Sequence, residues 1–341
     1  ARRHFSKVEI DAGREPEAGG EIIIGRIVGA EDWCAKHDSR YVELSKPQWL
    51  HSTRLKTIPT TDFPASMTGA PVAPRLYFAV FKEATIVPSP HALLLGREIL
   101  VLDGVVNMPH QFPQTSANVL HVTDDMRVAM RMRRESTHFE AEATYLGAAT
   151  NHFGGLYECL GRMWALEQEA NSANVPYILG EWVASELQPI LGTFGIGRDQ
   201  ILPLKPLDQM DIEKLSVPSM PLIGPWIAPV VLQYIRRKLI GESAVGSRKI
   251  FFTGRLRGNS RLRNEDELTT MLKSAGFEII SCKGMSVLDL LAEIQASDVI
   301  LSSDADCLAY SVVAPQGARL ALVVPEGALD PRLQFIAQPL G

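Results

Sequence analysis

The sequence predicts an α/β protein with two α/β lobes, the first of which begins with a β-rich segment. Strand-length apolar runs alternate with amphipathic helical segments from about residue 140, a pattern typical of parallel sheets with crossover helices. The alternation restarts near residue 248. The length of 341 residues also suits two domains at roughly 150 residues each. We therefore expect an N-terminal lobe over residues 1–225 and a C-terminal lobe over residues 226–341.

The first lobe opens with residues 1–20, which are polar and read as an arm. From 21 to 135 the chain shows short β-like runs such as EIIIGRIVG and RLYFAVFKEATIVPS, punctuated by Pro and Gly, with little helical periodicity. A basic cluster then follows. It is either a solvated face or a contact for an anionic substrate or lipid surface, and it contains Arg127, Arg131, Arg133 and Arg134.

Residues 140–215 predict a Rossmann-like unit. The run AEATYLG reads as a strand, and NHFGGLYECLGRMWALEQEA reads as an amphipathic helix. A strand at PYILGE, a helix near SELQPILGTFG and a strand at ILPLK come next. The proline-rich residues 216–229 are expected to bridge the lobes, and the helix APVVLQYIRRKL follows the bridge.

The C-terminal lobe repeats the pattern. RKIFFTG, FEIISC, DVILSS and ARLALVVP predict strands, with helices at EDELTTMLKSA, SVLDLLAEIQA and DCLAYSVVAP between them. Asn264 with Glu267, and Ser286 with Asp289, predict helix N-caps, and Gly276 predicts a helix end. Two facing lobes of this kind hold a ligand between them, near the carboxyl ends of the strands.

Composition excludes several classes of function. The chain has 34 Lys plus Arg against 39 Asp plus Glu, a net charge of −5, which argues against a nucleic-acid binder. No apolar run reaches the roughly 20 residues of a membrane span, and no secretory signal pattern is present. The four cysteines show no metal-ligand spacing, so we expect no metal and a reducing, cytoplasmic location. Peripheral contact with the inner membrane, through the basic cluster or the segment PLIGPWIAPVV, stays open.

A phosphate site is predicted in FTGRLRGNSRLRNEDE, which joins a strand to the next helix. Guanidinium groups and a helix N-terminus both bind phosphate oxygens. The alternative is a surface loop whose arginines pair with neighbouring acidic residues. The segment has neither a P-loop nor GxGxxG, which disfavours ATPases and dehydrogenases. The candidate donor-binding residues here are Arg255, Arg261, Arg263, Asn264 and Glu265.

The turn SSDADC offers a second set of donor-binding candidates. Small residues around Ser303 would let backbone N–H groups approach a ligand, and Asp304 or Asp306 would bind a sugar hydroxyl. The alternative is that one of these aspartates simply caps the helix.

The candidate catalytic bases lie in the first lobe. All eight histidines occur at or before His152, so a histidine base must come from the N-terminal half. His152 opens a predicted helix, Glu158 follows within it, and Glu181 ends a predicted strand. A lone histidine is also a common structural residue, and both interpretations stay open.

The segment from IFFTGRLRGNSRLRNEDE to ARLALVVP resembles the glycosyltransferase family 61 domain. The upstream segments YFAVFKEATIVPS, LLLGREILVLDG and NHFGGLYECLGRM also resemble that family, so the resemblance covers about residues 75–330. It implies a GT-B-like transferase with two Rossmann-like lobes that binds a nucleotide-sugar in the C-terminal lobe and transfers with inversion, without a bound metal. The positions that fall on the family pattern are Arg255, Arg261, Asn264, Glu265, Gly276, Phe277, Pro315 and Gly317.

Two departures from the family pattern concern histidines. The family carries His where this chain has Asp304, and Gly154 stands where its Asn-x-x-His-Trp motif has His. Either the donor and base differ, or the chain has lost activity. The leading hypothesis is an inverting glycosyltransferase of bacterial surface polysaccharide or capsule biosynthesis, which would act on a glycan or lipid-linked acceptor. The alternatives are a non-catalytic scaffold and a nucleotide-sugar epimerase.

Overall fold

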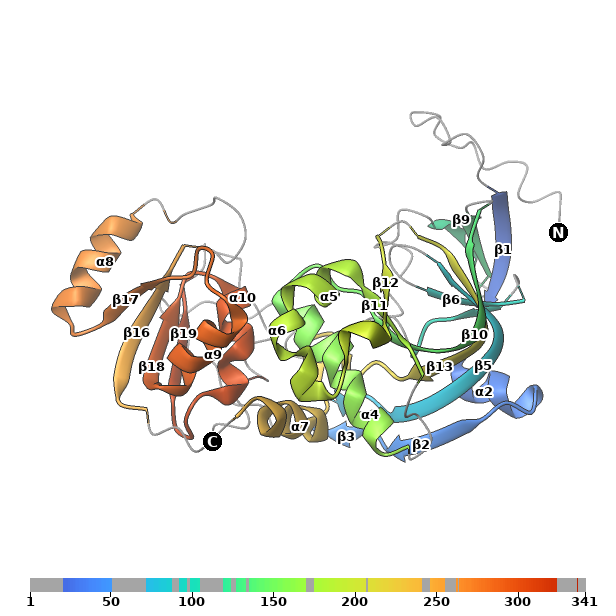
Figure 1. The fold of residues 1–341 in the computed structure, drawn as a ribbon, viewed down its shortest axis with the longest axis horizontal. Helices are drawn as coiled ribbons and strands as arrows, with labels where there is room; N and C mark the ends of the chain where they lie inside the picture. Colours follow the sequence, from blue (N-terminus) through green and yellow to red (C-terminus); the bar gives the residue numbers. More distant parts are fainter. Residues whose placement is uncertain are drawn as a thin grey trace.

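The computed structural model describes most of the chain between residues 21 and 323. The described residues are 21–50, 72–87, 92–96, 99–104, 119–123, 127–132, 135–169, 175–206, 208–240, 246–254, 262, 264–323 and 336. Their strands and helices form a mixed α/β structure with a larger and a smaller part (Figure 1). The larger part contains the N-terminal strands, and the smaller part contains the C-terminal ones.

The larger part is organised around one mixed sheet. Within the described residues it has eleven strands in the order β12-β11-β10-β13-β5-β6-β7-β1-β9-β8, with β2 also paired to β5. Its first half in sequence comprises β1 (Glu21–Ile27), β2 (Tyr41–Ser45), β5 (Leu76–Val87), β6 (Ala92–Leu95), β7 (Ile99–Val101), β8 (Val119–Val122) and β9 (Arg127–Met132). Its second half comprises β10 (Thr137–Gly147), β11 (Tyr177–Gly180), β12 (Ile201–Leu204) and β13 (Met210–Pro218). The predicted β-rich segment and the predicted Rossmann-like unit therefore share a single sheet.

Alternation along β5 explains how this sheet has a core on each face. Side chains of successive strand residues point to opposite faces. Leu76 and Phe78 join the core beneath the central helices, whereas Tyr77, Ala79 and Phe81 join the core on the side of α2 (Ala30–Lys36). The α2 helix is a finding that the sequence did not predict, because its seven residues carry too little helical periodicity.

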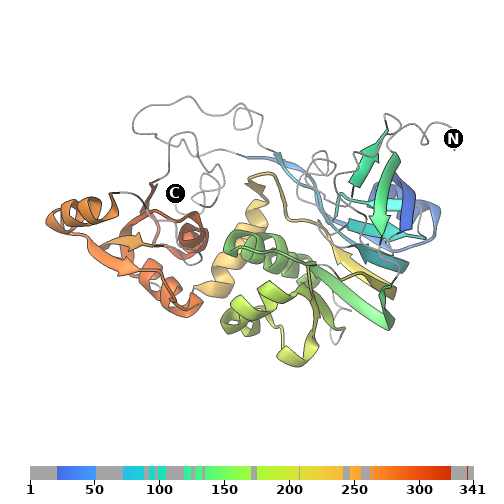
Figure 2. The same ribbon diagram turned by 90° about the horizontal axis from the view of Figure 1, so that it is seen from above.

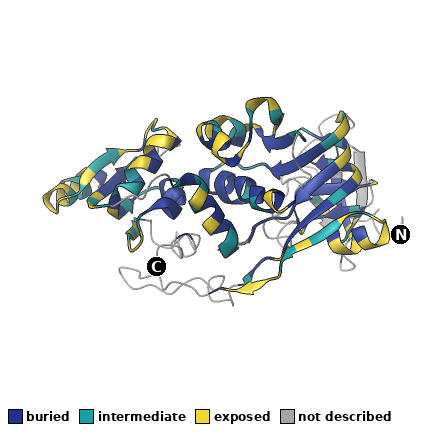
Figure 3. Ribbon diagram, turned by 60° about the horizontal axis from the view of Figure 1, so that its bottom comes forward, coloured by how far each residue is buried: buried dark blue, intermediate teal, exposed yellow. Residues whose placement is uncertain are grey.

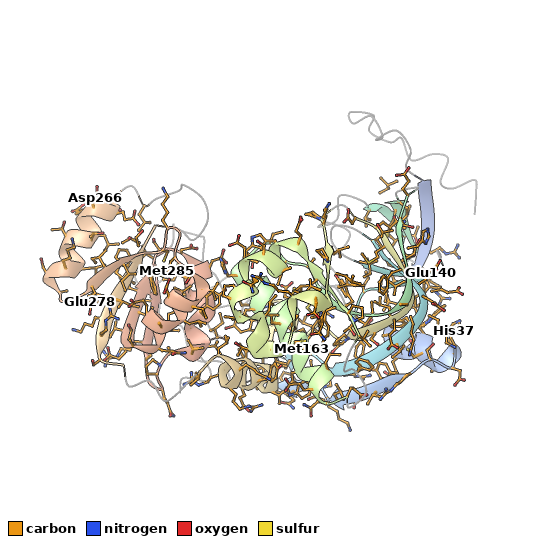
Figure 4. All side chains as sticks on the ribbon, viewed as in Figure 1. His37, Glu140, Met163, Asp266, Glu278 and Met285 are labelled. Atoms are coloured by element: carbon orange, nitrogen blue, oxygen red, sulfur yellow. The ribbon has the colours of Figure 1, made fainter. Side chains whose placement is uncertain are left out.

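Helices connect the parallel strands β10, β11 and β12. The first connection contains η3 (Gly154–Cys159), η4 (Leu160–Arg162) and α4 (Met163–Glu167), and the second contains α5 (Glu181–Glu186), α6 (Gln188–Leu191), η5 (Gly192–Phe194) and η6 (Arg198–Gln200). The predicted helix at 151–170 is confirmed, although its first turn is a π-helix. Met163 lies within this helical layer (Figure 4).

The smaller part is a four-stranded parallel sheet with helical connections, as the alternation predicted. Its strand order is β17-β16-β18-β19. The strands are β16 (Arg248–Thr253), β17 (Glu278–Ser281), β18 (Ser297–Ser302) and β19 (Arg319–Leu322), and the helices are α8 (Glu265–Ser274), α9 (Val287–Gln295), α10 (Ala305–Leu308) and η7 (Ala309–Val313). Met285, before α9, marks this part in Figure 4.

The two parts are packed against each other rather than merely tethered. One cluster of buried apolar residues runs from Leu146 and Leu156 in the larger part to Leu290 and Ile300 in the smaller. The helix α7 (Pro229–Leu239) lies at this junction, where Arg236 donates a hydrogen bond of 2.8 Å to the carbonyl of Ala314. Figure 2 shows α7 between the two sheets, and Figure 3 shows the buried residues concentrated in the central helices.

The proline-rich bridge and one helix cap differ from prediction. Residues 216–218 belong to β13, a central strand between β10 and β5, and the following residues form the hairpin β14 (Leu222–Ile223) and β15 (Trp226–Ile227). The capping box predicted at Asn264 is wrong, since that side chain accepts no capping hydrogen bond. The cap at Ser286 is confirmed by its 3.1 Å hydrogen bond from the Asp289 amide. A last short pair joins β3 (Gln48–Trp49) to β4 (Val72–Ala73).

The described helices include none that is both long and apolar enough to cross a bilayer. The segment PLIGPWIAPVV directs much of its apolar surface into the core, since Leu222, Ile227 and Val231 are at most 1% exposed.

Candidate functional site

The order of the smaller sheet singles out one edge as a candidate ligand site. From β16 the chain moves to β17 on one side, then crosses to β18 on the other side of β16. Ligands of open parallel sheets bind outside the carboxyl ends of the strands at such a reversal. We call this place, made by residues 253–254 after β16 and 302–306 after β18, the switch-point edge.

Gly254 begins the loop after β16 in a conformation that suits glycine. Its φ of +73° lies in the left-handed region, and a Cβ there would meet nothing within 4 Å. Its amide donates a hydrogen bond of 3.0 Å to Oε1 of Glu265, a buried side chain at the start of α8. The predicted donor-binding residue Glu265 thus fixes the beginning of the loop. Asn264 precedes it and is exposed.

The three arginines predicted to bind phosphate, Arg255, Arg261 and Arg263, lie outside the described residues. In the basic cluster, Arg127 is exposed at the start of β9, whereas Arg133 and Arg134 also lie outside the described residues.

The turn after β18 is organised by two side chains. The Ser302 hydroxyl accepts a hydrogen bond from the Asp304 amide and donates one to the Asp304 carbonyl, both 2.9 Å long. Asp304 Oδ1 accepts from the Asp306 amide at 3.1 Å, so Asp304 is the N-cap of α10. The capping alternative stated for Asp304 is therefore confirmed. Ser303, Asp304 and Asp306 all remain partly exposed at the switch-point edge.

Two buried thiols lie beside this turn. The sulfurs of Cys282, after β17, and Cys307, in α10, are 2.7 Å apart, and both residues are free cysteines. The contact with Cys282, together with burial, raises the pKa of the Cys307 thiol. The Cys307 thiol is therefore protonated at neutral pH.

His152 lies at the junction between the two parts. Its Nδ1 is 2.8 Å from the hydroxyl of Tyr310 in η7, and its ring contacts that of Trp182 edge-on, with centroids 5.2 Å apart. The side chain is only 3% exposed. His152 thus joins the helix after β10 to the smaller part, and in this arrangement it is shielded from solvent.

The other two candidate bases differ in exposure. Glu158 is half-buried in η3, and its main-chain carbonyl accepts a hydrogen bond of 3.0 Å from Arg162 Nε. Glu181 is exposed as the first residue of α5, directly after β11. Because Trp182 contacts His152, the first turn of α5 lies beside the histidine, and Glu158 belongs to the adjoining helix.

Gly154, where the resemblance would place a histidine, has little room. A Cβ on Gly154 would lie 2.8 Å from the Cβ of Ala149, closer than real Cβ contacts. The Gly154 amide also donates a hydrogen bond of 2.7 Å to Oδ1 of Asn151. Any larger residue at 154 would therefore require the turn after β10 to shift.

Arg162 is the polar residue that the sequence interpretation missed. It is 1% exposed, donates to the carbonyls of Gly104 (2.7 Å) and Pro218, and its Cζ lies 5.5 Å from the centroid of the Tyr145 ring. Burial lowers the pKa of this guanidinium. The available signal was an arginine within an apolar helical segment, but its partners are distant in sequence.

The described residues contain no group of three His, Cys, Asp or Glu side chains placed to hold a metal ion. Comparison of the chain with protein-family models finds no match, and comparison with curated proteins finds none either.

Proposed function

We propose that the protein is an inverting glycosyltransferase of GT-B-like architecture that binds a nucleoside-diphosphate sugar at the switch-point edge. The observation that carries the proposal is the parallel order β17-β16-β18-β19 with polar turns after β16 and β18. Counted from β16, that order is 2-1-3-4, the beginning of the 2-1-3-4-5 order of one class of doubly wound sheets, in which ligands bind where the order reverses. The arginine-rich segment follows β16 directly in sequence, where a diphosphate would need its charge neutralised.

In this proposal Arg255 and Arg261 stabilise the departing diphosphate, and Asp304 and Ser303 face the donor's hydroxyl groups. In the transition state the two guanidinium groups would stabilise the negative charge that develops on the leaving diphosphate. Among the three candidate bases, Glu181 is the exposed one, so it is the candidate that an acceptor hydroxyl reaches without rearrangement. The acceptor we propose is a glycan or glycoconjugate.

The test is calorimetric titration of UDP-, GDP-, dTDP- and CMP-sugars, with release of free sugar measured in parallel. Arg261→Ala should weaken binding of the preferred donor by about tenfold or more, the size expected for a charge-assisted hydrogen bond to phosphate. Arg198→Ala is the matched control, because it removes the same charge from an exposed position in η6. Saturable binding that survives Arg261→Ala would contradict the proposed phosphate site.

A pair of variants separates the cap from the donor contact at Asp304. Asp304→Asn keeps an oxygen that can accept from the Asp306 amide, whereas Asp304→Ala removes the cap. If Asp304 contacts the donor, both variants lose donor affinity while only the alanine variant loses stability. Equal donor affinity in the asparagine variant would leave Asp304 as a cap alone.

A non-catalytic nucleotide-binding protein is the second candidate function. Two observations favour it: positions 154 and 304, where the resemblance would place histidines, hold Gly154 and Asp304, and the nearby His152 is buried against Tyr310. Donor binding with no sugar release and no transfer, unchanged by Glu181→Gln, would support this candidate over the transferase.

A further inference from the structure

A pocket lined by both polar and apolar surface opens on the larger sheet, away from the switch-point edge. It has a volume of about 370 Å³, and its floor is formed by β5, β10 and β13. Its walls come from residues 38–40 between α2 and β2, from Glu169 after α4 and from Val175 before β11. Figure 1 shows α4, β2 and β5 together on the lower side of the larger part. This volume lies at the small end of the range of ligand pockets, roughly 300–1,000 Å³.

The floor is polar because of strand register. Lys214 of β13 is opposite Lys82 of β5 on one side and Glu142 of β10 on the other. Lys214 Nζ lies 2.7 Å from Glu142 Oε2, and the Ser216 hydroxyl donates to Glu142 Oε1 at 3.3 Å. Toward one end of this face, Leu76 and Phe78 of β5 and Leu146 of β10 belong to the apolar core, so the polar residues of the floor give way to apolar ones there.

The wall is held by a second ion pair. Arg40 binds Glu169, whose side chain is 9% exposed, and the Arg40 Cζ lies 5.6 Å from the centroid of the Phe78 ring. The Arg40 side chain is 46% exposed, so the pair is anchored by the buried Glu169 carboxylate and by the contact of Arg40 with Phe78. The pocket therefore has a preformed polar wall as well as a polar floor.

The charges lining the pocket balance. Three cationic side chains face three carboxylates, namely Arg40, Lys82 and Lys214 with Asp38, Glu142 and Glu169. A charged ligand would have to compete with the existing Arg40–Glu169 and Lys214–Glu142 pairs. A neutral ligand with several hydroxyl groups would not, since each paired carboxylate keeps spare lone pairs and each cation keeps spare N–H groups.

Hydroxyl side chains add to this preference. Ser39, Thr144 and Ser216 line the pocket, and each both donates and accepts hydrogen bonds. The Thr144 hydroxyl is fully buried and has no hydrogen-bond partner among the described residues. A buried hydroxyl left in this state is costly, and a ligand hydroxyl would satisfy it.

We propose that this pocket binds a neutral polyhydroxylated molecule of about monosaccharide size. The ligand's hydroxyl groups would bind Glu142, Lys214 and Thr144 on the floor, with its less polar face against Phe78 and Val80. The site is separate from the switch-point edge, and the proposal does not depend on glycosyl transfer.

The test is saturation-transfer NMR on the full chain without nucleotide. The neutral probes are D-glucose, D-galactose, N-acetyl-D-glucosamine and myo-inositol, and the charged matches are D-glucuronate, D-glucosamine and glycine. We expect at least one neutral probe to bind and the charged matches to bind more weakly. Absence of binding by every neutral probe, or preference for a charged probe, would overturn the proposal.

Variants locate the binding within the pocket. Glu142→Gln should weaken it about tenfold, the effect of losing a charged hydrogen-bond partner. Thr144→Val should weaken ligand binding several-fold without lowering the midpoint of thermal unfolding. If the Thr144 hydroxyl served only the fold, its removal would change the midpoint and leave binding unaltered. Glu140→Gln is the matched control, because it makes the same change on β10 outside this pocket, at the residue marked in Figure 4. Equal loss in Glu142→Gln and Glu140→Gln would place the binding elsewhere.

Discussion

The larger and smaller sheets both contain parallel strands joined by helices, but the carboxyl ends of those strands are built differently. At the end of β11, a Cβ on Gly180 would lie 2.7 Å from the Cβ of Ala148 and 2.8 Å from its Cα. At the end of β16, a Cβ on Gly254 would meet nothing within 4 Å. The first edge is packed as tightly as a core, whereas the second leaves space beside polar turns.

The polar residues follow the same division. Behind β10 and β11, Arg162 and His152 are almost completely buried and are bonded to neighbouring protein groups. At the switch-point edge, Ser303, Asp304 and Asp306 stay partly exposed. The buried polar residues behind β10 and β11 thus join segments of the fold together, whereas those at the switch-point edge are partly exposed to solvent. Each prediction below tests one side of this contrast.

The largest effect is expected at Arg162. Arg162→Met keeps much of the volume but leaves the buried carbonyls of Gly104 and Pro218 without their donor. At about 1–3 kcal/mol for each unsatisfied buried group, we expect a loss of about 3–5 kcal/mol in the free energy of unfolding. Urea denaturation followed by circular dichroism measures it.

The control for Arg162 is Arg198→Met, at an exposed position. It should change stability by less than about 0.5 kcal/mol. If Arg162→Met were as stable as the parent, the cost of burying the guanidinium would equal the gain from its hydrogen bonds, as happens when some buried charges are replaced by apolar residues.

The next effect tests how closely the edge of the larger sheet is packed. Gly180→Ala places a methyl group against the backbone of Ala148, so the strand ends must separate, at a cost of about 2–3 kcal/mol. Gly192→Ala is the matched control, since it has open space and helical φ and ψ of −58° and −32°. That variant should gain about 0.5–1 kcal/mol. Thermal unfolding of both variants checks the pair, and equal midpoints would mean that the edge of the larger sheet is not tightly packed.

The sequence predicted the smaller part better than the larger. Strands β16, β17 and β18 pair with neighbours fewer than 60 residues away, and each is a continuous apolar run with turn signals on both sides. Strand β13 was missed because its end runs into the proline-rich residues 216–229, which resemble a linker, and because it pairs with β5, far away in the sequence. A local pattern carries no information about such a partner.

The candidate site shows the same limit. The density of arginines and the small residues of the SSDADC turn were visible locally, and so was the capping alternative for Asp304. The role of Arg162 was not, because its carbonyl partners in Gly104 and Pro218 are 58 and 56 residues away. The burial of His152 depends on Tyr310, 158 residues further along the chain. Pairings of this kind are set by tertiary packing.

A smaller, pH-dependent effect is expected at Asp103, the residue before Gly104, whose carbonyl accepts a hydrogen bond from Arg162. Burial raises the pKa of this carboxyl above 3.8, although the Ala30 amide donates to it at 3.2 Å. As the pH rises, Asp103 therefore loses its proton in the unfolded chain before it does so in the folded protein. The free energy of unfolding then falls from about pH 4 until the pH has passed the raised pKa of the folded state. Asp103→Asn keeps an acceptor for Ala30 and should flatten that part of the stability–pH curve. Asp32→Asn, on the exposed side of α2, should leave the curve unchanged, and an unaltered curve in Asp103→Asn would contradict the burial effect.

The smallest effect compares two helix starts within the smaller part. Ser286 accepts a hydrogen bond from the Asp289 amide, whereas the Asn264 side chain makes no capping hydrogen bond. Ser286→Ala should therefore cost about 1 kcal/mol, and Asn264→Ala should cost close to nothing in the unfolding free energy. Urea denaturation of both variants measures the difference, provided that the free energy of unfolding depends on urea concentration with the same slope in both. Asn264 follows the arginine-rich segment in the sequence and precedes Glu265, which bonds to Gly254. A fall in donor affinity without a fall in stability would therefore indicate that this asparagine serves the ligand rather than the helix. A loss of stability equal to that of Ser286→Ala would show instead that Asn264 caps α8 in solution.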